Sequence, residues 1–323
     1  MRVIIPDDYQ DAVRSLDCFG KLKGQQVTIY RESVKDVEVL GARLRDAEVL
    51  VLIRERTAIT ESLLGLLPKL KLISQTGKGI AHIDLEACTH HGVAVAVGTG
   101  SPYAPAELTW GLVLSAMRHI PQEVARMKMG QWQTTLGLGL RGRTLGIFGY
   151  GKIGSIVAGY GRAFGMNVLV WGRSSSLVRA QADGFEIATS QAAFFRDADV
   201  LSLHLKLVEE TRGIVTATDL AYMKLSALLV NTSRAELIEF GALEEALWAG
   251  RPGAAAVDVY EVEPVTDHPL LRLDNVVYTP HLGYVEKDSY EHYFGTAFDQ
   301  VLAFATGNPI DIINPQAFLS TGL

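Results

Sequence analysis

The sequence predicts an α/β protein built from two doubly wound parallel sheets, with one unit inserted in the other. Short β-branched, apolar runs alternate with helical stretches along most of the 323-residue chain. This alternation is typical of parallel sheets whose two faces are both covered by helices. A Gly-, Ser- and Pro-containing break at residues 98–102 interrupts the pattern, which restarts near Thr144. A last helical stretch, residues 287–306, lies beyond the second set of strands.

Each predicted strand is a short apolar run bounded by turn residues. The strands of the first set are residues 2–5, 27–30, 49–53, 70–74 and 93–97. Those of the second set are residues 145–148, 168–171, 200–203, 228–231, 255–259 and 276–279. Helices are predicted between them at residues 37–45, 84–91, 106–119 (bounded by Pro121), 152–164 and 242–249. We therefore expect one domain from residues 1–100 and 287–323, and a second domain from residues 101–286.

Composition limits the classes of protein to which the chain can belong. It is 48% hydrophobic and 20% charged, which allows substantial cores. The net charge of −6 and the lack of a basic run argue against a nucleic-acid partner. No apolar stretch reaches about 18 residues, so no membrane span is expected, and the first residues do not resemble a signal peptide. Cys18 and Cys88 lack metal-ligand spacing, which predicts a cytoplasmic protein without a metal site.

A glycine-rich loop follows the first strand of the second set and opens the next predicted helix. It reads Gly149-Tyr150-Gly151-Lys152-Ile153-Gly154. The first glycine permits a tight turn, the second lets the backbone approach a pyrophosphate, and the third lets the helix pack on the strand. The free N–H groups of the helix would face the phosphates. We therefore predict a dinucleotide-binding Rossmann domain; the alternative is a glycine-rich turn that binds nothing.

The end of the next strand indicates which dinucleotide is preferred. NAD sites usually carry Asp or Glu there, to bind the ribose 2′-hydroxyl. This chain has Gly172, followed by Arg173 and Ser174. A cation next to serines suits a 2′-phosphate, so NADP is favoured over NAD. The alternative is that Arg173 stacks on the adenine or lies in solvent, in which case NAD remains the cofactor.

Three polar residues follow strands of the second set and are candidates for the chemistry. They are Arg234, Glu263 and His281, each beyond an apolar run. Hydride transfer to a carbonyl builds charge on its oxygen, which requires a proton donor and a fixed cation. Histidine changes charge near neutral pH, a carboxylate fixes its tautomer, and arginine matches a carboxylate with two parallel donors. The alternatives are a loop histidine, an exposed turn glutamate and a helix-capping arginine.

These motifs, in this order, resemble those of the D-isomer-specific 2-hydroxyacid dehydrogenases. Further landmarks are Gly77-Lys78-Gly79 and residues 203–205, 231–234, 258–264, 279–283 and 304–309. The resemblance implies a Rossmann cofactor domain inserted in a flavodoxin-like substrate domain. It implies an NAD(P)-dependent oxidoreductase that interconverts a small 2-keto acid and a D-2-hydroxy acid. It also implies a homodimer that forms through the cofactor domain, with residues 127–140 as a candidate contact.

The resemblance assigns roles to individual residues. His281 is the acid/base, Glu263 orients it, and Arg234 binds the substrate carboxylate. The implied cofactor contacts include the glycine loop with Lys152 and Ile153, and the strand end with Arg173 and Ser174. Further implied cofactor contacts are His204, Thr232, Ser233, Asp258 and Gly283. The implied substrate contacts are Arg54, Lys78 and Gly79.

The chain also departs from the family pattern. Lys206 and Ala235 stand where proline and glycine are common in the family, and the resemblance implies that both positions flank the cofactor. Lys78 stands where a small or apolar residue is common, which points to a more highly charged anion such as a phosphoglycerate- or phosphite-like substrate. Arg54 supports that alternative, whereas Gln75 replaces an arginine often found in phosphoglycerate dehydrogenases. A second alternative is a nicotinamide-sensing regulatory protein on the same fold.

Overall fold

The computed structural model of the chain describes residues 1–319 and shows two compact units. The first unit is Met1–Ser101 with Glu286–Leu323, and the second unit is Pro102–Val285. Each unit contains one sheet whose paired strands are all parallel. The predicted α/β fold class is therefore confirmed. Among the helices of residues 1–319, none has the length and apolar character needed to cross a bilayer.

The sheet of the first unit has five strands in the order β2-β1-β3-β4-β5. Its strands are β1 (Arg2–Ile5), β2 (Gln26–Ile29), β3 (Val49–Leu52), β4 (Leu72–Gln75) and β5 (Ala94–Val97). This order is that of flavodoxin-like sheets, in which ligands bind at the carboxyl ends of β1 and β3, where the order reverses. Strands β3 and β4 are buried along their whole length, which explains why they read as continuous apolar runs.

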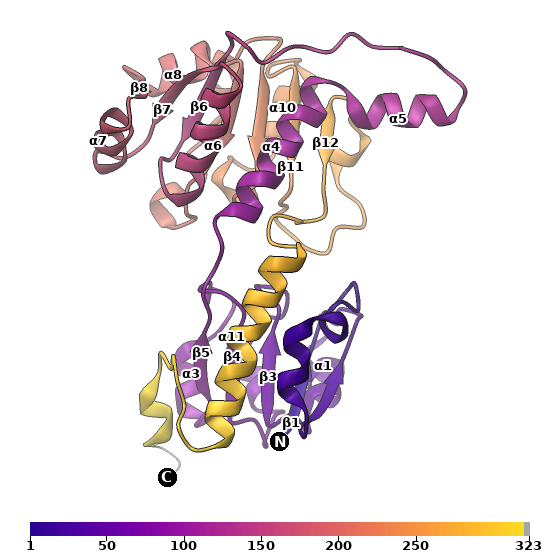
Figure 1. Cartoon of the computed structure of the whole chain (residues 1–323), viewed down its shortest axis with the longest axis vertical. Coiled ribbons are helices and arrows are strands. Elements are labelled where there is room, and N and C mark those ends of the chain that lie inside the picture. The colour runs from indigo at the N-terminus through magenta and orange to yellow at the C-terminus, as the bar shows by residue number, and fades with distance from the viewer. Residues whose placement is uncertain (320–323) are drawn as a thin grey trace. The chain divides into compact units, whose positions relative to one another are not determined.

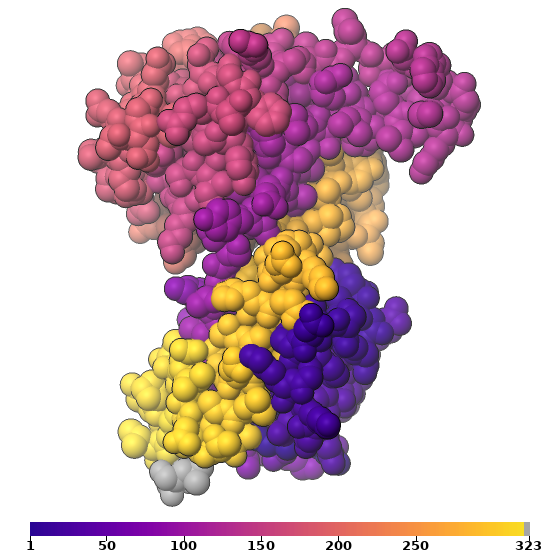
Figure 2. All heavy atoms as spheres, viewed as in Figure 1, coloured from indigo at the N-terminus to yellow at the C-terminus, as the bar shows by residue number. Residues whose placement is uncertain are grey.

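Helices cover this sheet, and their first turns are capped by side chains that the sequence supplies. The helices are α1 (Val37–Leu44), α2 (Glu61–Leu64), α3 (Leu85–His90) and α11 (Lys287–Ala305), with 3-10 turns η1 (Val13–Ser15), η2 (Asp17–Leu22) and η6 (Pro315–Phe318). Asp36, Thr60, Asp84 and Glu286 accept hydrogen bonds from the first turns of the four α-helices. Although α11 is late in the sequence, its atoms lie beside the N-terminal η2 (Figure 2).

The sheet of the second unit has seven strands in the order β12-β11-β10-β9-β6-β7-β8. Its strands are β6 (Thr144–Phe148), β7 (Asn167–Trp171), β8 (Glu186–Ile187), β9 (Val200–Leu203), β10 (Leu228–Asn231), β11 (Ala254–Val257) and β12 (Val276–Tyr278). Starting from β6, this is the Rossmann order with one further strand at the edge. The order reverses between β6 and β9, which places a switch point at the end of β6.

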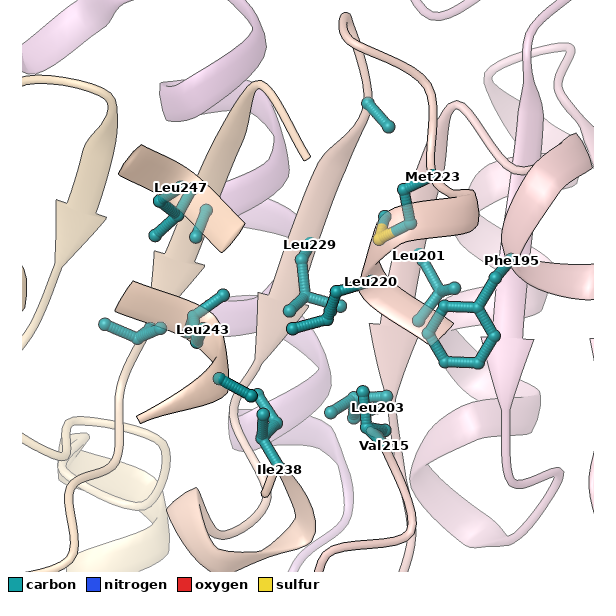
Figure 3. Close-up of a cluster of buried hydrophobic side chains, with 14 of the residues drawn as sticks. Phe195, Leu201, Leu203, Val215, Leu220, Met223, Leu229, Ile238, Leu243 and Leu247 are labelled. Carbon is teal, nitrogen blue, oxygen red and sulfur yellow. The ribbon is translucent and has the colours of Figure 1, made fainter. Parts of the chain in front are cut away.

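Two hydrophobic cores sandwich this sheet. The helices are α4 (Tyr103–Met117), α5 (Ile120–Lys128), α6 (Lys152–Ala163), α7 (Ser174–Ala182), α8 (Gln191–Asp197), α9 (Ala217–Tyr222) and α10 (Ala242–Trp248), with 3-10 turns η3 (Glu209–Thr211), η4 (Ala235–Leu237) and η5 (Pro269–Arg272). Helices α4 and α6 lie on one face (Figure 1). On the other face, Leu220 and Leu243 pack toward strand residues such as Leu229 (Figure 3).

Two local predictions were wrong. Pro121 was expected to end the helix at residues 106–119, but it lies in the first turn of a separate helix, α5. Helix α4 ends at Met117, and the left-handed backbone of His119 (φ 53°) separates the two helices. Proline is tolerated in a first turn because its missing N–H would have no partner there. The two-residue strand β8 was not predicted because it is too short to show a periodicity.

Candidate active site

The glycine loop has the backbone geometry that a pyrophosphate cradle requires. Gly149 has φ 97°, a conformation that favours glycine, and its N–H donates to the Trp171 carbonyl at 2.8 Å. Around Gly151 the space is open, because a Cβ atom built there meets no atom within 4 Å. At Gly154 a Cβ atom would collide with the Gly149 carbonyl oxygen. Helix α6 begins at Lys152 without a side-chain cap, so its first N–H groups face this open space.

The second segment that the sequence predicted to contact the nucleotide follows β7. Gly172 has φ 157°, and a Cβ atom there would lie 3.6 Å from the Gly149 Cα. The strand end therefore lies directly against the glycine loop. Arg173 is the N-cap residue of α7, and its side chain is exposed together with that of Ser174. An exposed arginine at a helix N-terminus provides a positive site for an anion.

The chain after β9 also borders the loop. A Cβ atom on Gly149 would lie 2.7 Å from the His204 carbonyl oxygen, so residue 204 packs on the first glycine. The His204 Nε2 atom lies 2.9 Å from the Ser202 hydroxyl. Burial lowers the pKa of His204 to about 4. The His204 ring is therefore neutral around pH 7 and can contact a cofactor only as an uncharged group.

The predicted arginine lies on a turn shaped by a buried asparagine. The Asn231 amide Nδ2 donates to the Arg234 carbonyl at 2.8 Å, and its Oδ1 accepts from the Ser233 N–H at 3.0 Å. The Ser233 hydroxyl donates to the Leu203 carbonyl at 2.8 Å, which ties the turn to β9. One arm of Arg234, Nη1, donates to the Ser233 carbonyl at 2.7 Å. This contact limits the orientations that the half-buried guanidinium can adopt.

His281 and Glu263 form a close hydrogen-bonded pair. The His281 Nδ1 atom lies 2.7 Å from the Glu263 Oε2 atom. A carboxylate can only accept, so Nδ1 carries the proton and Nε2 is the nitrogen that can exchange protons with a ligand. The two residues follow β11 and β12, which are paired in parallel with Val257 opposite Tyr278. The side chain of His281 is 24% exposed and that of Glu263 is 34% exposed, so the pair is accessible from solvent.

Asp258 is fully buried beneath the turn that carries His281. Its Oδ1 accepts from the Thr279 hydroxyl at 2.6 Å and from the Leu282 N–H at 2.7 Å, and its Oδ2 accepts from the Gly283 N–H at 2.9 Å. Burial raises the pKa of Asp258, although these donors and the nearby His281 ring favour the charged form. Three donors thus surround the two oxygens of this buried carboxylate.

In the first unit, Arg54 lies against the predicted substrate loop. Arg54 has a left-handed backbone (φ 54°), and its N–H donates to the Thr76 hydroxyl at 2.9 Å. A Cβ atom on Gly77 would collide with the Arg54 guanidinium. The guanidinium carbon also lies 5.6 Å from the centre of the Tyr293 ring. The charge of Arg54 is thus held above the loop backbone at the carboxyl edge of the five-stranded sheet.

Lys78 and Gly79 continue this loop with different environments. The Lys78 side chain is exposed. A Cβ atom on Gly79 would collide with the Glu55 carboxylate, so the loop and the segment after β3 are in close contact. Gln75 is buried, and its amide donates to the carbonyls of Arg54 at 3.0 Å and Gly79 at 2.9 Å. Gln75 therefore joins the two substrate-loop segments as a scaffold residue.

Comparison with known proteins identifies the family. Residues 110–283 match the model described as "D-isomer specific 2-hydroxyacid dehydrogenase, NAD binding domain". The chain is 36% identical over 295 residues to a glyoxylate reductase of Aeropyrum pernix, with 86% of each chain covered. The chain belongs to the D-isomer specific 2-hydroxyacid dehydrogenase family. The resemblance stated from the motifs is therefore confirmed.

Two further relatives carry phosphoglycerate names. A D-3-phosphoglycerate dehydrogenase of Methanocaldococcus jannaschii is 38% identical over 287 residues, which are 88% of this chain and 53% of that protein. The chain thus spans about half the length of that relative. A solved structure of a candidate D-3-phosphoglycerate dehydrogenase oxidoreductase from Ralstonia solanacearum is 56% identical, with a TM-score of 0.96 and 98% of each chain covered.

Several residues that brace the nucleotide loop were not predicted. The Tyr150 hydroxyl donates to the Asp183 carboxylate at 2.6 Å, and the Arg179 guanidinium donates to the Tyr150 carbonyl at 2.8 Å. These contacts tie the glycine loop to helix α7 and to the residue after it. Their partners are separated by about thirty residues, and no local motif marks the pairing. Only the position of Tyr150 between two motif glycines could have suggested a structural role.

We predict that Gly154→Ala disrupts the nucleotide site, because the added Cβ atom would displace the Gly149 carbonyl. Affinity for NAD(H) or NADP(H), measured by fluorescence titration, should fall at least about tenfold, a change of roughly 1.4 kcal/mol, and the melting temperature should drop. Gly159→Ala is the matched control on the same helix, since a Cβ atom there meets nothing within 4 Å. It should bind like the wild-type protein. Equal affinities of the two variants would contradict the packing argument.

Proposed function

We propose that the chain is an NAD(P)-dependent oxidoreductase that interconverts a 2-keto acid and a D-2-hydroxy acid. The observation that carries the proposal is the 2.7 Å contact between His281 Nδ1 and Glu263 Oε2. It lies in the same unit as the glycine loop, on strands that share one sheet with β6. A paired histidine and a nucleotide cradle on one sheet provide the two things that carbonyl reduction needs: a proton donor and a seat for a hydride carrier.

In this mechanism, His281 gives the proton from its Nε2 atom to the substrate carbonyl oxygen. Glu263 stabilises the imidazolium form before the transfer and keeps the ring in one tautomer. Arg234 binds the substrate carboxylate, and its positive charge also favours the charge that builds on the carbonyl oxygen. The nicotinamide, when bound, supplies the hydride. In the reverse direction a neutral His281 accepts the proton of the hydroxy acid.

Other residues of the second unit would seat the cofactor. Gly149, Gly151 and Gly154 form a cradle that backbone N–H groups line, which fits a pyrophosphate. We place Asp258 at the nicotinamide carboxamide, as the family resemblance implies. Thr232 is within 2.7 Å of the Thr109 hydroxyl, which fixes its side chain near the Arg234 turn. We place NADP ahead of NAD, because Arg173 and Ser174 are exposed at a strand end without an acid.

A second candidate substrate is a more highly charged 2-hydroxy acid, such as a phosphoglycerate. The specific observation in its favour is the position of Arg54, whose guanidinium lies on the Gly77 backbone and near the Tyr293 ring. Exposed Lys78 adds a second cation to the same loop. Arginine and lysine suit phosphate oxygens better than a neutral substrate tail. The names of two relatives agree with this candidate.

We also propose that the protein is a cytoplasmic homodimer. Support for the dimer comes from the segment that follows α4, where helix α5 has no buried residue. Met127, Met129, Trp132 and Leu136 are 64–93% exposed, and this segment extends from the sheet of the second unit (Figure 1). Exposed apolar patches of this kind are typical of contacts between proteins. Sedimentation equilibrium would measure the oligomeric state, and a monomeric mass would contradict the proposed dimer.

The proposed function is tested by a panel of 2-keto acids, each assayed with NADH and with NADPH by cofactor fluorescence. The panel includes glyoxylate, hydroxypyruvate, pyruvate and phosphohydroxypyruvate. We predict turnover of at least one acid, with NADPH at least as effective as NADH, and a selective loss of NADPH activity in Arg173→Ala. Binding of the cofactor without turnover of any acid would favour a nicotinamide-sensing protein. Strong preference for NADH would remove Arg173 from the 2′-phosphate role.

Arg234→Lys should impair catalysis severely although the charge is kept, because lysine lacks the two parallel donors of a guanidinium. We expect kcat/KM to fall by an amount that corresponds to about two to four kcal/mol of transition-state stabilisation, as for other single electrostatic donors. Cofactor affinity should not change. Arg212→Lys is the control, since Arg212 forms only a surface ion pair with Glu236 at 4.0 Å. Near-normal kcat/KM in Arg234→Lys would remove this residue from the anchor role.

Reduction needs a protonated His281 and oxidation a neutral one, so their rates should fall in opposite directions with pH. Reduction should decline as pH rises, and oxidation as pH falls. The alkaline fall in the rate of reduction and the acidic fall in the rate of oxidation are the two limbs of the pH–rate profiles. Because Glu263 favours the charged ring, Glu263→Gln should move both limbs to lower pH. The histidines His82 and His204 cannot produce these limbs near neutrality, since burial lowers the pKa of each to about 4.

Glu61→Gln is the matched control for this measurement. It removes the carboxylate of another histidine pair, in which Glu61 lies 2.9 Å from His91 in the first unit. Its two pH–rate profiles should overlay those of the wild-type protein. Limbs that stay in place in Glu263→Gln would show that Glu263 is not the partner of the titrating group.

A further inference from the structure

Tyr260 contacts the loop of Glu263 through its backbone. It lies three residues beyond the end of β11, and its side chain is 8% exposed. The Tyr260 N–H donates to the Glu263 Oε1 atom at 3.1 Å. The other carboxylate oxygen, Oε2, is the one that contacts His281. Each oxygen of Glu263 therefore has its own donor, and the plane of the carboxylate is fixed by both.

The other end of Tyr260 reaches the turn that carries His281. Its hydroxyl donates to the Thr279 carbonyl at 3.2 Å. Burial raises the pKa of the Tyr260 phenol, with Asp258 and Glu263 adding to the shift, so the hydroxyl remains a donor at neutral pH. The same carbonyl accepts the His281 N–H at 3.1 Å, in a turn where His281 has φ 51°.

Thr279 is consequently held at three atoms. Its N–H donates to the Val257 carbonyl at 3.0 Å, and its hydroxyl donates to Asp258 at 2.6 Å. Its carbonyl is the acceptor for Tyr260. The first two contacts join Thr279 to the end of β11, whereas the Tyr260 hydroxyl joins it to the loop of Glu263. The hydroxyl contact therefore adds a link between the loop of Glu263 and the turn of His281, beside the hydrogen bonds that Asp258 accepts from that turn.

The ring of Tyr260 is itself held from the side. The His268 ring lies 5.4 Å from it with an interplanar angle of 67°, an edge-to-face arrangement. The His268 Nδ1 atom accepts the Leu270 N–H at 3.2 Å, so the neutral ring carries its proton on Nε2, which lies 3.2 Å from the Glu261 carboxylate. The pair of His268 and Glu261 thus packs against the side of the Tyr260 ring and limits its rotation.

We propose that Tyr260 is a positioning residue for the proton donor. It does not touch the substrate; it fixes the separation and angle of Glu263 and His281 by holding the loop of one and the turn of the other. The inference rests on the proposed function, in which His281 is the acid/base. Loss of the hydroxyl would let the His281 turn move, lengthen the contact with Glu263 and weaken the stabilisation of the imidazolium.

Three ionisable groups lie near the His281 ring and could influence its charge. They are Glu263, which accepts from Nδ1, Asp258 beneath the turn, and Tyr284, whose ring centre lies 5.3 Å away. Tyr260→Phe alters none of these three groups. A shift in the titration of His281 in that variant would therefore not come from the loss of one of these three groups.

The test compares Tyr260→Phe with the wild-type protein. We expect the alkaline limb of keto-acid reduction to move to lower pH by about half a unit, and kcat to fall about three- to tenfold, the range that one hydrogen bond provides. The KM for the cofactor should not change. Tyr30→Phe is the matched control, because it also removes a hydroxyl that donates to a backbone carbonyl, that of Arg43 at 3.3 Å in the first unit. Its profile should be that of the wild type.

A second readout does not depend on turnover. The His281 ring signal is followed against pH by NMR in protein with labelled histidine, and is assigned by its loss in His281→Gln. In Tyr260→Phe the midpoint of this titration should move down. An unmoved midpoint in a variant with wild-type melting temperature and cofactor affinity would overturn the proposal, whatever the change in kcat. If the wild type reduces no keto acid, the proposed function fails, and the ring titration still decides the role of Tyr260.

Discussion

A carboxylate held 2.7 Å from one nitrogen of an imidazole decides what the other nitrogen can do. Glu263 keeps the proton of the neutral His281 ring on Nδ1, which leaves Nε2 as the nitrogen that is available to a ligand. The contact exists because β11 and β12 are neighbours in parallel register, with Val257 opposite Tyr278. A shift of one residue in either strand would turn its side chains to the opposite face. The chemistry of the site therefore depends directly on the order of the sheet.

Burial of the Asp258 carboxylate is unfavourable by itself, and hydrogen bonds from the surrounding turn offset this cost. Asp258 has no exposed surface, and a buried carboxylate is unfavourable unless donors surround it. The turn after β12 provides them from the Thr279 hydroxyl and from the Leu282 and Gly283 N–H groups. The same hydrogen bonds fix the turn on which His281 lies. A single buried acid thus orders the backbone of the turn that carries His281.

Much of this arrangement could be predicted from local sequence signals. The alternation of short apolar runs and helices indicated two parallel sheets, and the spacing of Gly149, Gly151 and Gly154 indicated the nucleotide loop. Strand ends indicated where Arg234, Glu263 and His281 would lie, because polar residues that follow buried runs gather at one edge of a parallel sheet. The hydrogen bond between His281 and Glu263 agrees with that expectation, whereas their catalytic roles stay predictions. These signals lie in short stretches of the sequence. What the structure adds to them is the order of the strands, which determines which strand ends are neighbours.

What the sequence did not show depends on contacts between distant residues. The Tyr150–Asp183 hydrogen bond, the position of Arg54 beside Tyr293, and the link from Tyr260 to Thr279 join segments with no shared motif. Pro121 was misread for a related reason: proline is compatible with both the end and the start of a helix, and the left-handed His119 that selects between them is not visible in the sequence.

In the proposed reaction, the reduced cofactor delivers a hydride to C2 of a 2-keto acid while His281 protonates the oxygen from a fixed side. The most direct measurement uses reduced cofactor with deuterium at the transferred position, and resolves the hydroxy acid formed by chiral chromatography and mass spectrometry. We predict a D-2-hydroxy acid with one deuterium on C2 from the wild-type protein, and none of this product from His281→Gln. An L product, a product without deuterium, or full activity in that variant would contradict it.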